Sequence, residues 1–353
     1  ITDYIELAAA ADGLQISVAG PSAWCAQLEG SKDFSKAFMG RHNIPTARYQ
    51  SFQLSQLDEA AAFLKTLEPP YVLKADGLAA GKGVIITPSF DEAMETLQAM
   101  TDGSRFGKAG EVVVIEEFLK GIELSVFGIS DGHDWKILAS AKDYKRIFDN
   151  DEGPNTGGMG AISPVPFADE TFMQKVVERI MKPTYEGLVA EGHPYKGFLF
   201  VGLMNVNGDP YVIEYNVRMG DPETEAIFPR LQTPMLDLLE AMATDNLSTV
   251  DVKLDQRTAA TIFLVSGGYP GDIEKGKEIQ FPASQGKDQW LFHAGTKHDG
   301  NRVVTNGGRV IAVTSLGDNI AAALQRSNEL ASQIQFDGKF NRTDIGLDLM
   351  RLI

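Results

Sequence analysis

The sequence predicts an α/β (α+β) fold that ends in a mostly β region. Between residues 46 and 119, short β-branched segments alternate with segments of helical apolar spacing, which is the pattern of an α/β unit. After residue 248, strand-like segments predominate and a single long helical segment follows them. The chain has 353 residues, which is enough for two or three domains.

Composition and charge exclude several classes of protein. The formal net charge of −16 argues against nucleic-acid and anionic-membrane partners. No apolar run approaches the roughly 18 residues of a transmembrane helix. Cys25 is the single cysteine, so no intramolecular disulfide is possible and we expect a reducing, cytoplasmic location. The five histidines lack the spacing of a zinc site.

The first segment resembles the end of an α/β unit. Residues 4–11 are Ala-rich and predict a helix, and residues 14–19 predict a short strand that Gly20-Pro21 terminates. One helix and one strand cannot bury a core, so we expect residues 1–29 to be the remnant of a preceding domain. The sequence begins at Ile1, without an initiator Met, and we expect a segment upstream of it. A helix over residues 31–40 follows.

The remaining elements follow from periodicity and turn signals. A hairpin is predicted around Asp131-Gly132, and a second one is predicted at Asn207-Gly208. Residues 149–166 are glycine-rich and predict a long irregular loop. The predicted strands span residues 71–75, 84–87, 112–116, 123–129, 135–141, 198–206, 211–216, 259–265, 289–294 and 309–314. The predicted helices span residues 91–100, 170–191, 234–244 and 318–335.

A glycine-rich connection follows Lys74. Glycines let backbone N–H groups approach phosphate closely, and lysines supply positive charge. The connection fails as a P-loop, because three residues separate Gly77 from Gly81 and no Ser or Thr follows Lys82. Residues 84–86 also predict a strand where a P-loop needs a helix. The pattern favours a flexible hairpin over a triphosphate, and a solvated surface hairpin is the alternative.

Two further segments offer chemistry to a nucleotide. The strand that ends at residues 116–119 can present backbone groups to an adenine edge, and Glu123 can bind ribose hydroxyls. Solvated acidic residues at a strand end are the alternative. In residues 214–218, strand alternation puts Glu214, Asn216 and Arg218 on one face. A carboxylate beside an amide oxygen suits Mg²⁺, and an arginine binds an anionic oxygen. The alternative is a polar edge strand.

Charged residues also precede a second glycine-rich loop. Asp143 and Lys145 precede residues 153–160, whose backbone amides could form a nest for an anionic substrate. A linker that is only flexible is the alternative.

The order of these signals resembles the ATP-grasp superfamily. Within it, residues 153–161 and 216–224 resemble the phosphoribosylamine–glycine ligase family. Further matches extend over essentially the whole chain; they are residues 27–32, 43–47, 266–271, 293–296 and 306–310. The resemblance implies an ATP-grasp domain over residues 30–248 with a lid at 46–119, and a β-rich C-terminal domain over 249–353. It also implies a monomer or weak dimer.

The resemblance implies a reaction in purine biosynthesis. ATP, glycine and 5-phosphoribosylamine would give glycinamide ribonucleotide, ADP and phosphate through glycyl phosphate, with Mg²⁺ or Mn²⁺. The residues implied for ATP are Lys32, Lys74, Gly81, Lys82, Gly83, Glu116, Glu117, Leu119 and Glu123. Those implied for the metal are Glu214 and Asn216. Those implied for catalysis are Lys145, Arg218 and Asp221, and those for substrate are Asp143, Asn155, Thr156, Gly157 and Gly158.

Two departures from the family pattern and two alternative functions accompany this assignment. The strand over residues 198–206 offers no carboxylate for a second metal, and Tyr144 stands where the family usually has His. One alternative is a related ATP-grasp ligase that uses a different amine. The other is a nucleotide-binding module without catalytic activity.

Overall fold

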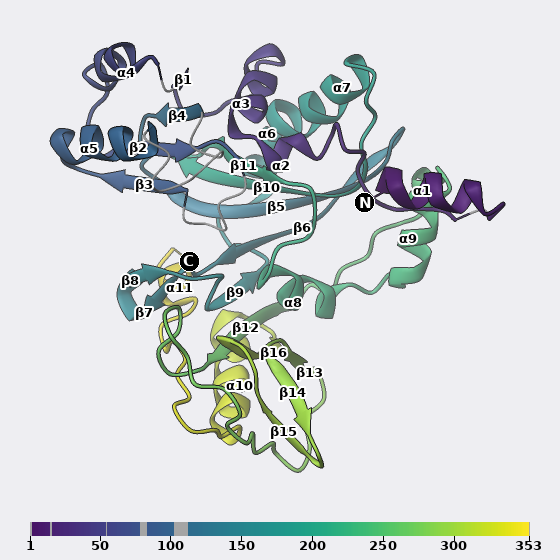
Figure 1. Cartoon of the computed structure of the whole chain (residues 1–353). Helices are drawn as coiled ribbons and strands as arrows, with labels where there is room; N and C mark the ends of the chain where they lie inside the picture. Colours follow the sequence, from purple (N-terminus) through teal and green to yellow (C-terminus); the bar gives the residue numbers. More distant parts are fainter. Residues whose placement is uncertain (1, 15, 54, 78–82, 102–111, 353) are drawn as a thin grey trace.

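Two sheets organise the chain, which we describe from a computed structural model. The structure describes residues 2–14, 16–53, 55–77, 83–101 and 112–352. One sheet has four strands in the order β1-β4-β2-β3, and the other has eight in the order β11-β10-β5-β6-β9-β12-β16-β13. Figure 1 shows the small sheet at one end of the molecule and the last hundred residues at the other.

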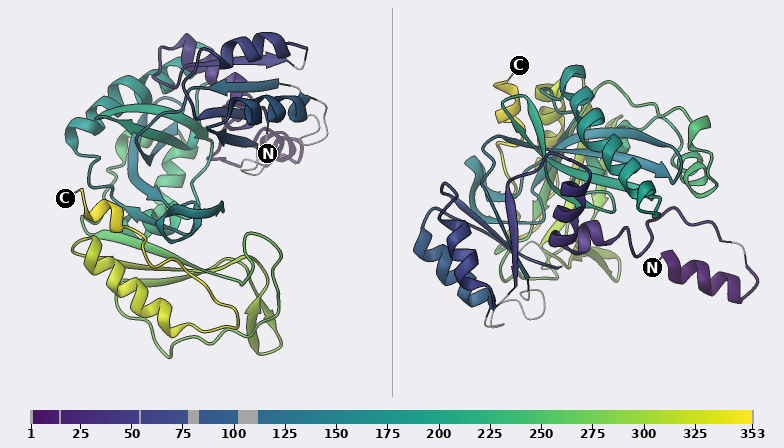
Figure 2. Two further views of the ribbon diagram at one scale, coloured as in Figure 1. Left: turned by 90° about the vertical axis from the view of Figure 1, so that its left-hand side faces the viewer. Right: turned by 90° about the horizontal axis from the view of Figure 1, so that it is seen from above.

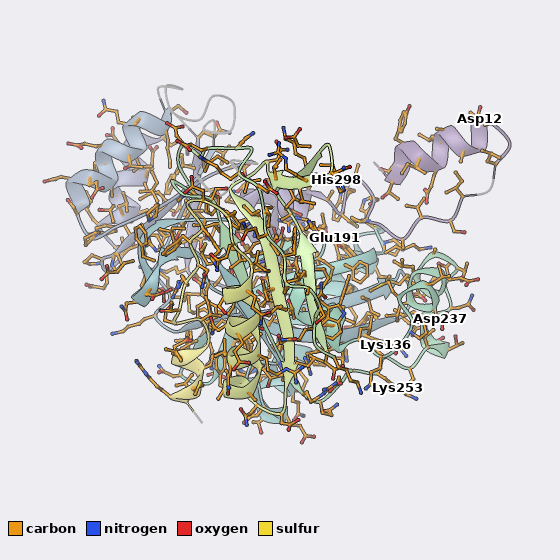
Figure 3. All side chains as sticks on the ribbon, turned by 90° about the horizontal axis from the view of Figure 1, so that it is seen from below. Asp12, Lys136, Glu191, Asp237, Lys253 and His298 are labelled. Carbon is orange, nitrogen blue, oxygen red and sulfur yellow. The ribbon has the colours of Figure 1, made fainter. Side chains whose placement is uncertain are left out.

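The N-terminal segment lies largely outside this body. Helix α1 (Thr2–Ala11) is followed by a strand-free stretch, and α2 (Gln27–Gly30) and α3 (Lys32–Arg41) then pack on the body. The right view of Figure 2 shows α1 at the margin, and Figure 3 places Asp12, just beyond it, at the outer edge. The strand predicted at residues 14–19 is wrong for the residues of that segment that the structure describes. Leu14 and Ile16 are at least half exposed there, since no neighbouring strand pairs with them.

The small sheet is the predicted lid region. Its strands are β1 (Tyr49–Gln53), β2 (Tyr71–Ala75), β3 (Val84–Thr87) and β4 (Val112–Glu116), all antiparallel. Helices α4 (Leu57–Leu64) and α5 (Phe90–Thr101) cover one face, where Leu64, Leu73, Leu97 and Ile115 share a core. Strands β2 and β3 pair as the glycine-rich hairpin requires. Of its predicted ATP contacts, Gly81 and Lys82 lie outside the described residues.

The central strands carry a core on each face. They are β5 (Ile122–Asp131), β6 (Trp135–Asp143), β10 (Lys196–Val206) and β11 (Asp209–Asn216). Val126 packs under α7 (Lys182–Ala190), whereas the next residue, Phe127, faces α9 (Met235–Ala243), as strand alternation requires. The predicted helix at 170–191 consists of α6 (Glu170–Val176), a π-helical turn (Val177–Met181) and α7. Asn207 and Gly208 both have positive φ, as their hairpin turn needs.

The loop predicted at residues 149–166 contains regular structure. Strand β8 (Glu152–Asn155) pairs with β7 (Arg146–Phe148), and a 3-10 turn (Asp149–Asp151) joins them. Strand β9 (Gly160–Ser163) is buried between β6 and β12 and makes the large sheet continuous. A Cβ at Gly160 would lie 2.4 Å from the Thr261 carbonyl oxygen, so the glycine that suggested a loop is needed for close strand packing.

The last part of the chain builds the far end of the large sheet. Helix α8 (Glu223–Ile227) and two 3-10 turns (Phe228–Arg230, Leu247–Thr249) lead into β12 (Thr258–Val265), β13 (Gln289–His293) and β16 (Arg309–Gly317). Helix α10 (Ile320–Gln333) packs on this sheet, and α11 (Leu347–Met350) follows. The hairpin of β14 (Thr296–Asp299) and β15 (Arg302–Thr305) was not predicted. No helix among the described residues is long and apolar enough to span a bilayer.

Candidate active site

A buried ionic triad lies where the lid meets the body. The carboxylate of Glu116, at the end of β4, lies 2.9 Å from the ammonium of Lys74 and 3.0 Å from that of Lys36. All three residues are less than 7% exposed. Burial opposes ionisation of Glu116, but Lys74 and Lys36 hold its pKa below the ordinary value. The triad therefore fixes the ammonium of Lys74, which is a predicted phosphate ligand.

Lys36 was missed by the sequence analysis. Burial lowers its pKa to about 8, although the charge of Glu116 opposes the shift. Its ammonium also donates to Thr46 Oγ1, whose hydroxyl in turn donates to the Val212 carbonyl of β11, both at 2.7 Å. The signal that could have found it is its spacing from Lys32, because residues four apart share one face of a helix.

Lys32 lies in the same electrostatic neighbourhood. Ser31 caps α3 by accepting from the Phe34 N–H, and the next side chain, Lys32, donates to the Gly77 carbonyl at 3.0 Å. Burial lowers the pKa of Lys32; the charge of Glu214 opposes this shift, and that of Lys74 adds to it. Lys32, Lys74 and Glu214 are thus close enough to act on one polyanion.

The segment over residues 116–119, which was predicted to meet adenine and is called the hinge below, borders an open pocket. After β4 ends, the backbone N–H of Glu117 donates to the Arg48 carbonyl, and its side chain accepts from the Arg48 N–H. A pocket of about 550 Å³ lies between this hinge and the turn that joins β10 to β11. It is lined by Glu117, Phe118, Leu119, Lys120, Val206, Asn207 and Tyr211.

Three predicted residues form a charge cluster beyond the hinge. The Lys145 ammonium lies 2.7 Å from a Glu123 oxygen and 3.9 Å from an Asp143 oxygen. Burial raises the pKa of Asp143; Lys145 counteracts the shift and Glu123 adds to it. Burial opposes the charge of Lys145, but Asp143, Glu123 and Glu214 hold its pKa above the ordinary value. Glu123 was predicted to meet the ribose, yet in this structure its carboxylate is bound by Lys145.

A second buried acid, Glu223, adjoins Asp143 and was not among the predicted site residues. It lies in the first turn of α8, is 3% exposed, and accepts from the Ser125 hydroxyl at 3.2 Å. Burial, followed by the charge of Asp143, raises its pKa to about 8. Its place in the family-like run of residues 216–224 was the available signal.

The predicted metal pair lies on one face of β11. Glu214 is exposed and Asn216 is partly exposed, whereas Tyr215 between them is buried and its hydroxyl lies 2.8 Å from that of Thr184. Among the described residues, no group of three or more His, Cys, Asp or Glu could hold a metal ion. One carboxylate and one amide oxygen nevertheless fit Mg²⁺ or Mn²⁺, which fills its octahedral shell with water and substrate phosphates.

Arg218 lies beyond the end of β11 and is therefore not part of its alternating face. Its guanidinium lies 3.1 Å from a Glu29 oxygen and donates to the Asn216 amide oxygen at 3.1 Å. The second Glu29 oxygen accepts from the Val217 N–H at 2.9 Å. Glu29, which was also missed, thereby fixes Arg218 beside the metal pair.

The loop over residues 155–158 is close to the cluster, but its amides are already bound. The N–H of Thr156 donates to the Lys145 carbonyl, that of Gly157 to the Tyr269 hydroxyl, and that of Gly158 to the Thr156 hydroxyl. The N–H of Met159 donates to the Tyr144 carbonyl. In this conformation the backbone amides of residues 156–159 therefore donate within the protein, and the anion nest stays a prediction.

Asp221 also has a partner within the protein. Both of its carboxylate oxygens lie 2.9 Å from the guanidinium of Arg309, which the sequence analysis did not place in the site. Asn155 is exposed at the end of β8, and Gly83 directly precedes β3. Arg309 thus connects β16 to the segment that carries Arg218.

Comparison with known proteins identifies the family of the chain. The family model described as "Phosphoribosylglycinamide synthetase, ATP-grasp (A) domain" matches residues 30–224, and the C domain of the same synthetase matches residues 259–348. A phosphoribosylamine–glycine ligase of Vibrio cholerae is 46% identical over 333 residues, which are 94% of this chain and 77% of the relative. A bifunctional purine biosynthetic protein of Schizosaccharomyces pombe is 48% identical over 327 residues, 92% of this chain and 41% of that protein.

Solved structures show the same fold. The crystal structure of the phosphoribosylamine–glycine ligase of Thermotoga maritima has a TM-score of 0.85 and 39% identity, and covers 92% of this chain and 81% of that one. A biotin carboxylase domain of Hydrogenobacter thermophilus has a TM-score of 0.73 at 16% identity, covering 99% of this chain and 74% of that one, and shows likeness of fold alone. The chain belongs to the phosphoribosylamine–glycine ligase family and has its ATP-grasp fold.

Proposed function

We propose that the cleft between the lid and β11 is where this chain joins glycine to 5-phosphoribosylamine. As a member of its family, the chain is an ATP-dependent ligase of purine biosynthesis. The observation that carries the site assignment is that α3, which carries Lys32, packs against β11, which carries Glu214, while the triad fixes Lys74 beside α3. This grouping supports one site for a metal–nucleotide complex and an activated carboxylate.

ATP binding follows from the charges and the hinge. Lys32 and Lys74 would neutralise the phosphates, which is most of what phosphoryl transfer requires of a protein. The pocket at Leu119 and Tyr211 would take the adenine. Glu123 would be free to bind the ribose once Lys145 has left it for an anionic substrate. We expect Lys145 to change partners in this way when the substrates bind.

Glu214 and Asn216 would hold Mg²⁺ or Mn²⁺, which supplies charge neutralisation between the phosphates. A glycine carboxylate oxygen attacks the γ-phosphorus, the bond to the β-phosphate oxygen breaks, and ADP leaves. The amine of 5-phosphoribosylamine then attacks the carbonyl carbon of glycyl phosphate, and inorganic phosphate leaves with the bonding pair. Arg218 is positioned to stabilise the negative charge of the tetrahedral state. Asp143 is the nearby carboxylate that would take the amine proton, whereas Glu223, whose pKa is raised to about 8, holds a proton of its own at neutral pH.

The test of this function is the substrate dependence of ADP release. We expect release with the full chain only when glycine, 5-phosphoribosylamine, ATP and a divalent cation are all present. Release that needs glycine but not 5-phosphoribosylamine would favour a ligase for another amine. ATP binding without release under any of these conditions would favour the module without catalytic activity.

We also propose the domain boundaries 1–29, 30–248 with a lid at 46–119, and 249–353. The ranges of the two family models support them, although β9 joins both parts into one sheet. A cytoplasmic location and a monomer or weak dimer stay predictions, the former supported by the single buried thiol of Cys25.

A further inference from the structure

The start of β16 carries an arginine whose contacts lie in another part of the chain. Two Arg309 nitrogens bind the two carboxylate oxygens of Asp221, and one of them also donates to the Gly157 carbonyl at 2.6 Å. The guanidinium lies over the Phe263 ring, 4.6 Å from its centroid. A bidentate, stacked arginine is a rigid contact, because its planar fork matches the carboxylate. Arg309 therefore fixes two segments relative to each other.

A tyrosine supports the same loop from the same end of the molecule. The Tyr269 hydroxyl accepts from the Gly157 N–H at 3.0 Å. A Cβ at Gly308 would lie 2.1 Å from the Tyr269 ring, so the residue before Arg309 must be glycine for this ring to fit. Both polar groups of Gly157 are thus bound by side chains that follow residue 258.

The loop transmits this position to the charge cluster. The N–H and the hydroxyl of Thr156 both donate to the Lys145 carbonyl, at 2.7 and 2.8 Å. The Lys145 ammonium in turn faces Glu123 and Asp143. The other segment that Arg309 binds is that of Asp221, which lies three residues after Arg218 in the chain. Arg309 thus acts on Lys145 through Gly157 and Thr156, and on Arg218 through Asp221. The proposed function assigns Lys145 to an anionic substrate and Arg218 to the tetrahedral state. Arg309 has no such connection to Lys32 or Lys74.

We propose that Arg309 and Tyr269 are positioning residues for amine transfer, so that the C-terminal sheet sets the geometry of ligation and leaves ATP-dependent activation of glycine unaffected. This inference rests on the proposed function. It gives the C-terminal part a role in the reaction beyond completing the fold. Neither residue touches the reacting atoms in this assignment; each acts through residues 157 and 221.

The experiment separates the two halves of the reaction in the full chain. With ATP and glycine alone, activation is measured by glycine-dependent positional isotope exchange of the β,γ-bridging oxygen of ATP, which needs reversible formation of glycyl phosphate and ADP but no attack on the carbonyl carbon. With 5-phosphoribosylamine, glycinamide ribonucleotide is measured instead. The variants are Arg309→Met, Arg309→Lys and Tyr269→Phe. Arg302→Met is the control, because Arg302 makes exposed ion pairs with Asp299 and Glu278 in the same part of the chain.

For Arg309→Met we expect the kcat/KM for 5-phosphoribosylamine to fall at least tenfold, with the rate of isotope exchange and the KM for ATP within twofold of the parent. The kcat/KM of Arg309→Lys for 5-phosphoribosylamine should lie between those of the parent and Arg309→Met. Tyr269→Phe should lower the same kcat/KM about threefold. Arg302→Met should match the parent. Tyr269→Phe removes one hydroxyl, so it decides the outcome if Arg309→Met does not fold.

Equal loss in both halves, or no loss in ligation, would overturn the positioning role. These outcomes require an active parent, so they leave the proposed function intact. A parent that shows neither isotope exchange nor ribonucleotide formation would instead refute the proposed function, and this inference with it.

Discussion

Lys36 shows how one side chain can determine a site without touching it. Its ammonium shares the Glu116 carboxylate with Lys74 in an almost solvent-free place. Removing one partner of a buried ion pair is costly, because it leaves a charge that neither water nor protein compensates. The periodicity of α3 predicts the helix, but not that a lysine on it is buried, since the other two members of the triad are 38 and 80 residues away.

The substitution Lys36→Met tests this residue. Glu116 keeps Lys74, so we expect a loss of roughly 2–3 kcal/mol in the free energy of unfolding, below the full cost of an unpaired charge. Urea denaturation measures it. Lys182→Met is the matched control, because Lys182 lies on a helix surface 3.8 Å from Glu186 and should change stability by less than about 0.5 kcal/mol. A loss below 1 kcal/mol for Lys36→Met would contradict the triad's role.

Glu223 predicts a dependence of stability on pH. Its pKa is raised to about 8, above the ordinary carboxyl value, so the native state holds a proton that the unfolded state has lost. Between about pH 4.5 and pH 8, this group therefore lowers the stability as the pH rises, by at most about 1.4 kcal/mol per pH unit. The stability that Glu223 contributes in its protonated form is fully present below the pKa of the unfolded state. It is lost as the pH rises through the pKa of the native state.

The variant Glu223→Gln keeps the shape of the side chain and stays neutral. We expect its unfolding free energy to fall less steeply than the parent's between pH 5 and pH 8, measured by urea denaturation at several pH values. Glu152→Gln, at an exposed position, is the control and should follow the parent. Parallel pH profiles for Glu223→Gln and the parent would show that Glu223 is ionised throughout this range.

At the scale of elements, the accuracy of prediction depended on local signals. The strands at 71–75, 84–87 and 112–116 were predicted with the bounds that the structure has, because each is a short, largely apolar run and each adjoins turn residues. The segment at 14–19 has the same composition but no partner strand. Strands β8 and β9 were hidden by glycines that the packing requires. Local pattern thus predicts an element only where tertiary contacts agree with it.

The turn between β8 and β9 gives a prediction at this scale. Gly158 has φ of +110°, and an added Cβ would lie 2.3 Å from Pro222 Cδ. Gly158→Ala should therefore cost about 2–4 kcal/mol in unfolding free energy, from backbone strain and the displaced proline. Gly192→Ala isolates the strain, since Gly192 has φ of +81° with nothing within 4 Å, and should cost about 1 kcal/mol. Equal losses, measured by urea denaturation, would mean that Pro222 moves freely.

At the scale of the whole molecule, the site is built from segments that are distant in sequence. The resemblance predicted Lys32, Lys74, Glu214 and Lys145, and the structure brings them into one electrostatic neighbourhood. Glu29, Arg309 and Tyr269 were missed because each acts through a partner at least 88 residues away. Motif spacing contains no information on such pairs. The large sheet, continuous through β9, explains how Arg309 of β16 reaches the loop over residues 155–158.

The central claim is that Glu214 and Asn216 hold a divalent ion together with the nucleotide. Binding of Mn²⁺, followed by electron paramagnetic resonance with and without ATP, tests it most directly. We predict that ATP increases Mn²⁺ binding to the parent and that Glu214→Ala weakens the ternary complex at least tenfold, while Glu278→Ala, at an exposed site, leaves it unchanged. Equal Mn²⁺ affinity in the ATP complexes of the parent and Glu214→Ala would contradict the account.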